Sequence, residues 1–99
     1  MKITNLTSAQ LLSMALEYET TAKAHAEQRL AFSRLCKQVM SSPRRFTAWG
    51  VDYLYESERE SKAALYRSKE SFHRSQFEHF QQQAAFYFNL AISTEMGGQ

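Results

Sequence analysis

Apolar and polar positions from residue 8 to residue 40 recur with the spacing of an α-helix, and no Gly or Pro interrupts them. Most residues of this stretch are Ala, Leu, Glu, Gln, Lys or Arg, which favour helices. Thr7 or Ser8 is suited to cap its start, and Pro43 stops it because proline cannot continue a helix. We predict a helix over about 8–40, followed by a turn over 41–46.

A second helical pattern follows the turn and ends at Gly97-Gly98, as glycine commonly does at helix C-termini. We predict a helix over about 47–96. Gly50 is its one internal breaker, so a short separate turn of helix over 43–49 is compatible with the pattern. The sequence allows one break near residue 50 and another near residue 80.

Both helices contain a row of residues spaced alternately by three and four positions, which is the seam of a coiled coil. In the second helix the row consists of small residues: Ser57, Ser61, Ala64, Ser68, Ser71 and Ser75. In the first helix it is Leu11, Ala15, Tyr18, Ala22, His25 or Ala26, Arg29, Phe32, Cys36 and Val39. Small residues on facing seams allow a close approach of two helices.

The fold class that these rows predict is all-α, a long antiparallel helical hairpin. With the turn at 41–46, the numbers of facing residues add to roughly 86, so Ala22 faces Ala64 and Tyr18 faces Ser68. The alternative is that the serine row is a solvated polar face. Against that alternative, charged residues already supply a separate face: Glu56, Glu58, Arg59, Glu60, Lys62, Arg67 and Lys69.

In this register the first helix covers the second only to about residue 79, and an apolar aromatic segment overhangs. Exposed apolar patches mark interfaces, and a two-helix hairpin of this size buries little surface by itself. The segment either folds back as a third helix or pairs with another chain. We predict a homodimer that completes a helical bundle.

Composition narrows the class of protein. The 99 residues allow a single domain over 1–99, and the single cysteine excludes a disulfide scaffold. The net charge of +2 calls for neither nucleic acid nor an anionic membrane. Neither a secretory signal nor a membrane-spanning run is recognisable, so we expect a cytoplasmic protein and no membrane partner.

The 13 aromatic residues are unevenly placed, because only Tyr18 and Phe32 precede Phe46. Aromatic and basic residues gather at the turn, where they either cap the hairpin core, form a protein-binding hot spot or bind nucleic acid. We predict that the partner-binding residues are Arg44, Arg45, Phe46, Trp49, Tyr53, Phe80, Phe86, Tyr87 and Phe88.

Glu70 and His73 form a Glu-x-x-His pair, which in di-iron helical bundles supplies two metal ligands. The simpler interpretation is a surface pair in which Glu70 meets Arg74 one turn later. The sequence contains no Gly-rich phosphate loop, no Cys pair and no serine-nucleophile motif. We therefore predict no enzyme activity, no cofactor and no metal.

By exclusion, we expect a small non-enzymatic protein–protein interaction module. An adaptor, a chaperone-like protein or an inhibitor of the kind that bacteria or phages encode fits this description. The alternatives are a nucleic-acid-binding protein that uses Arg44, Arg45 and the basic residues of the second helix, and a ferritin-like metal-binding dimer that uses Glu70 and His73.

Overall fold

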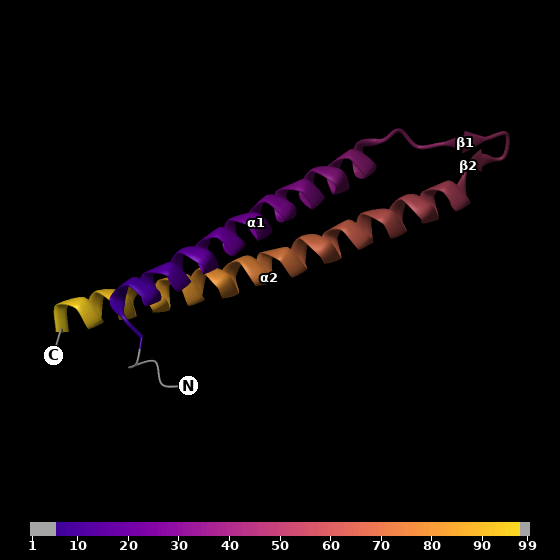
Figure 1. Cartoon of the computed structure of the whole chain (residues 1–99). Coiled ribbons are helices and arrows are strands. Elements are labelled where there is room, and N and C mark those ends of the chain that lie inside the picture. The colour runs from indigo at the N-terminus through magenta and orange to yellow at the C-terminus, as the bar shows by residue number, and fades with distance from the viewer. Residues whose placement is uncertain (1–5, 98–99) are drawn as a thin grey trace. The chain divides into compact units, whose positions relative to one another are not determined.

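Two long helices and a short β-ribbon make up residues 6–97, the part of the chain that the computed structural model describes. Helix α1 (Ser8–Ser41) is followed by strands β1 (Phe46–Thr47) and β2 (Gly50–Val51) and by helix α2 (Tyr53–Gly97) (Figure 1). The helices pack antiparallel, so the predicted all-α helical hairpin is confirmed. The predicted homodimer stays a prediction.

Helix α1 starts and ends close to where the sequence predicts. The backbone N–H of Gln10 donates to Thr7 Oγ1 at 3.1 Å, and the N–H of Thr7 donates to Gln10 Oε1 at 2.8 Å. This reciprocal pair is a capping box, which makes Thr7 the N-cap. Ser8 instead donates its hydroxyl to the carbonyl of Ala91 at 3.2 Å. The helix ends at Ser41, two residues before Pro43.

The connection between the helices differs from the prediction. The short turn of helix that the sequence allows over 43–49 is not formed, because β1 and β2 form an antiparallel ribbon there, with Phe46 opposite Val51 and Thr47 opposite Gly50. Helix α2 therefore begins at Tyr53 rather than near residue 47. The break near residue 50 is present as this ribbon, whereas α2 is continuous through residue 80.

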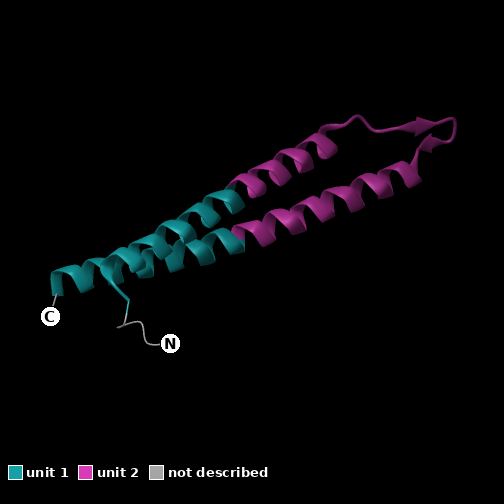
Figure 2. Ribbon diagram, viewed as in Figure 1, with its two compact units in different colours: residues 1–26, 75–99 teal, residues 27–74 magenta. Residues whose placement is uncertain are grey.

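The chain forms two compact units, each built from one stretch of α1 and one of α2 (Figure 2). In unit 1, whose described residues are 6–26 and 75–97, the Tyr18 ring stacks on Phe80 and Tyr87 with centroids 6.0 and 5.5 Å apart. Leu11 is the one large side chain among the described residues that is fully buried. Alanines complete the core of unit 1: Ala15, Ala22 and Ala91.

Unit 2 comprises residues 27–74 and has a more polar seam. The Phe32 ring lies 5.6 Å from the His73 ring and 6.1 Å from the Tyr66 ring. The Cys36 thiol donates to the carbonyl of Ala63 at 3.8 Å, and both residues are buried. Cys36 is thus a small core residue, as its place in the predicted row of the first helix indicates.

The predicted row of the first helix is confirmed, because each of its members is buried or half-buried. The predicted row of the second helix is wrong, since Ser57, Ser61, Ala64, Ser68, Ser71 and Ser75 are all exposed. They follow the packed positions by one or two residues, which turns them toward solvent. The alternative, a solvated serine face, is the one found. The packed row of α2 is Arg59, Ala63, Tyr66, Glu70 and His73 in unit 2, and Phe77, Phe80, Ala84, Tyr87 and Ala91 in unit 1.

The register follows from the longer connection. Facing residues have numbers that add to 98 or 99, as for Tyr18 with Phe80 and Cys36 with Ala63, rather than to 86. Eleven residues, 42–52, separate the helices. Most of the expected aromatic overhang is therefore covered by α1. Ser8 bonds to both Ala91 and Glu95, and α2 ends just beyond them at Gly97.

Arg59 closes the C-terminal end of α1. Its Nε donates to the carbonyl of Val39 at 2.9 Å, its Nη2 donates to the carbonyl of Met40, and its Nη1 donates to Glu56 Oε1 at 3.2 Å. The Arg59 and Glu56 side chains are only 12% and 15% exposed, so their expected place on a charged solvent face is wrong. A cation at a helix C-terminus satisfies carbonyls that have no partner within the helix.

We predict that Arg59→Met lowers the free energy of unfolding by about 2–3 kcal/mol, because it leaves the Glu56 carboxylate and two carbonyls without their partner. Urea unfolding followed by circular dichroism measures the change. The matched control is Arg67→Met at an exposed position of the same helix, for which we expect a change within about 0.5 kcal/mol. Equal losses in the two variants would contradict a capping role.

Candidate functional site

Five of the predicted partner-binding residues lie together at the end of unit 2 that carries the ribbon. We call these residues the ribbon tip: Arg44, Arg45, Phe46, Trp49 and Tyr53. Its three aromatic side chains are largely in solvent, since Phe46 is 68% exposed, Tyr53 is 82% exposed and Trp49 is 98% exposed. They do not cap the hairpin core, so that interpretation of the cluster is wrong.

The ribbon holds Trp49 in a tight two-residue loop between Thr47 and Gly50. The backbone N–H of Trp49 donates to Thr47 Oγ1 at 3.2 Å, and the same hydroxyl donates to the carbonyl of Gly50 at 3.3 Å. Gly50 has a φ of +116°, a conformation that only glycine adopts without strain. The loop conformation thus depends on its neighbours, while the indole ring itself packs on nothing.

Asp52 joins the ribbon to α2. Its N–H donates to the carbonyl of Arg45 at 2.8 Å, which closes the ribbon. Its Oδ1 accepts from the N–H of Tyr55 at 3.1 Å and its carbonyl accepts from the N–H of Glu56 at 3.0 Å, as expected of an N-cap. Asp52 was not among the residues predicted from the sequence, although an aspartate two positions after Gly50 is a recognisable helix-start signal.

The two arginines of the ribbon tip differ in their surroundings. The Arg45 guanidinium lies over the Tyr55 ring, 5.5 Å from its centroid, which is within the range of a cation–π contact. Arg44 is exposed. Among the described residues neither forms an ion pair, so the ribbon tip carries two positive charges that are not neutralised locally.

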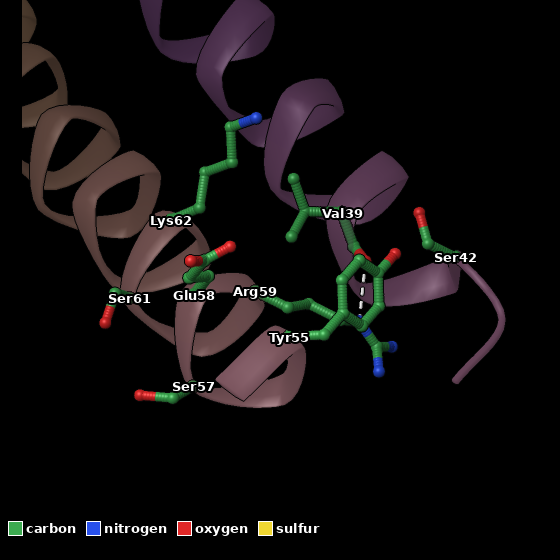
Figure 3. Close-up of a pocket in the computed structure, with 8 residues that line it drawn as sticks. All are labelled: Val39, Ser42, Tyr55, Ser57, Glu58, Arg59, Ser61 and Lys62. Carbon is green, nitrogen blue, oxygen red and sulfur yellow. Dashed lines mark hydrogen bonds between the residues drawn. The ribbon is translucent and has the colours of Figure 1, made fainter. Parts of the chain in front are cut away.

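A hollow of about 560 Å³ lies where the end of α1 faces the start of α2 (Figure 3). Arg59 crosses it, but its guanidinium is already bonded to the α1 carbonyls and Glu56, so it has little capacity left to hold a ligand. Figure 3 shows Ser57 and Ser61 pointing away from Val39. Ser42, Glu58 and Lys62 complete the polar part of its lining.

The other predicted partner-binding residues lie on α2 in unit 1. Phe80 and Tyr87 are half-buried against Tyr18, and Phe80 also stacks on His25 at 5.6 Å. Phe86 and Phe88 are 52% and 44% exposed. Only these last two rings of the aromatic segment present a large part of their surface to solvent.

Glu70 and His73 do not assemble a metal centre with other described residues. Glu70 Oε1 accepts from Arg74 Nη2 at 3.4 Å, and the His73 ring stacks on Phe32. Over residues 6–97 no three His, Cys, Asp or Glu side chains are grouped as metal ligands would be. Across the same residues, neither helix combines the length and the apolar character that crossing a bilayer requires.

We predict that Asp52→Ala lowers the free energy of unfolding by about 1 kcal/mol, because it removes the acceptor for an N–H in the first turn of α2. Thermal and urea unfolding measure the loss. Asp52→Asn is the control, since asparagine caps helices as well as aspartate does and should retain nearly all of the stability. An equal loss in both variants would show that the aspartate charge, not the cap, matters.

No protein-family model, curated protein or solved structure matches the chain.

Proposed function

We propose that this protein is a small non-enzymatic interaction module, of the adaptor, chaperone-like or inhibitor type, that binds another protein through the ribbon tip. The observation that carries the proposal is the 98% exposed indole of Trp49 on a constrained loop. Exposed apolar clusters of this kind mark interaction sites, and Trp, Tyr and Arg dominate binding hot spots.

The shape and charge of the ribbon tip indicate what surface its partner should have. Trp49 sits at a turn and is not recessed in a hollow, so the partner has to supply the pocket. Arg44 and Arg45 flank the aromatic residues and form no ion pair with another described residue. An apolar pocket with an acidic rim complements these features, because opposite charges around an apolar anchor steer association and fix its orientation.

The charge distribution favours a protein over a nucleic acid. Helix α2 contains six glutamates against five lysines and arginines, so it supplies no excess of positive charge. The ribbon tip alone adds two arginines, and binding to phosphate backbones depends on the number of phosphates neutralised. Nucleic-acid binding is therefore the weaker candidate. The metal-binding dimer is not supported by any cluster of possible metal ligands among the described residues.

We predict that Trp49→Ala weakens partner binding at least about 30-fold, the loss typical of a hot-spot residue. It should leave the free energy of unfolding within about 0.5 kcal/mol of the wild type, because the ring makes almost no contacts. The experiment immobilises the protein, captures partners from a lysate of the cells that express it, and compares affinities for each captured protein. Phe72→Ala is the matched control, since Phe72 is an exposed ring of unit 2 outside the ribbon tip.

Capture that both variants retain equally would refute a role for the ribbon tip. A mobility shift of labelled DNA or RNA that weakens steeply with salt and requires Arg44 and Arg45 would favour the nucleic-acid alternative instead.

A further inference from the structure

A second exposed apolar surface lies in unit 1, on one side of the helix pair. We call it the leucine–phenylalanine face, and it consists of Leu12 and Leu16 of α1 and Ala85, Phe88 and Ile92 of α2. Its four large side chains are between 40% and 52% exposed. Residues three, four and seven positions apart share one side of a helix, which groups these residues on each helix.

A groove of about 510 Å³ runs along this side of unit 1. Its floor contains alanines of both helices, Ala15 and Ala84 among them, and the rings of Phe77 and Phe88 border it. Alanines at facing seam positions leave space between the helices, whereas the neighbouring Tyr18–Phe80 layer is filled. The face therefore contains a hole with an alanine floor next to projecting leucine and isoleucine side chains.

The chain exposes more surface to solvent than a globular monomer of the same mass does. The protein exposes 7524 Å², whereas a folded monomer of 11.5 kDa exposes about 5,800 Å². The excess of about 1,700 Å² is a total for the whole chain, and it is large enough to include the area that each partner buries in a homodimer. Among the described residues only six apolar side chains are buried, and five of them are alanine or cysteine.

We infer that the leucine–phenylalanine face binds a second copy of this chain. The face carries both parts of a packed interface, since Leu16 and Ile92 are exposed and lie about one helical turn from the groove-lining Glu19 and Phe88. A two-fold axis through the face lets the projections of each copy enter the groove of the other.

The charges on this side are compatible with self-association. Glu19 and Lys23 line the groove and form an exposed ion pair at 3.2 Å, so the groove carries one charge of each sign. Two copies therefore meet without net repulsion at the groove. A dimer formed in this way also carries two copies of the ribbon tip, although the inference does not depend on what that tip binds.

The test measures the mass of the full chain in solution by light scattering and sedimentation equilibrium. We expect twice 11.5 kDa for the wild type. Phe88→Glu should weaken the dimer at least roughly 100-fold, because it places a charge in an apolar interface. Phe86→Glu is the matched control, since Phe86 is a somewhat more exposed ring two residues away, on another side of α2 and outside the groove. Circular dichroism checks that both variants keep their helices.

A second pair of variants covers the case in which Phe88→Glu fails to fold. Leu16→Glu should dissociate the dimer, while Leu30→Glu, at an exposed leucine of unit 2, should not. A wild-type protein that stays at 11.5 kDa up to a chain concentration of about 1 mM overturns the inference. It is also overturned if the control variants dissociate as readily as Phe88→Glu and Leu16→Glu, or if none of the four dissociates.

Discussion

Tyr18 stacks on both Phe80 and Tyr87, and this aromatic layer fixes how α1 and α2 meet in unit 1. Once these rings are paired, the neighbouring seam positions bring alanines of the two helices together, as at Ala15 and Ala84. Alanine cannot fill the space that aromatic rings hold open, so a groove remains. The groove and its apolar border are thus consequences of the register that the aromatic layer imposes.

Unit 2 keeps the same register with different chemistry. There Arg59 donates hydrogen bonds both to the α1 carbonyls and to Glu56, and these bonds replace much of what apolar packing supplies elsewhere. Such bonds are directional, so they specify one arrangement of the helix ends, whereas alanine contacts tolerate sliding. Asp52 bonds the ribbon to the start of α2, and the Trp49 indole has no structural role there.

The sequence was sufficient for the two helices and for the packed row of α1, because that row combines apolar residues with heptad spacing, and it narrowed the N-cap of α1 to Thr7 or Ser8. It was misleading for α2, where the serine row has the same spacing as the true row. The true row contains Arg59, Glu70 and His73, which look like surface residues in the sequence, although Arg59 and His73 contact α1. The error in register came from the turn, since the cap at Asp52 was not recognised.

Some aromatic residues of this chain stabilise the fold, whereas others are exposed and available for binding. Tyr18, Phe80 and Tyr87 are needed within unit 1, whereas Trp49 contributes almost no contact area, so the folded state gains little from an indole at that position. Exposed tryptophan favours non-specific association, which is a cost unless the ring is covered in a complex. If two chains associate through the leucine–phenylalanine face, each assembly presents two such rings. A partner with two matching pockets then binds with avidity well above the affinity of a single tip, provided that the spacing of its pockets allows both to engage.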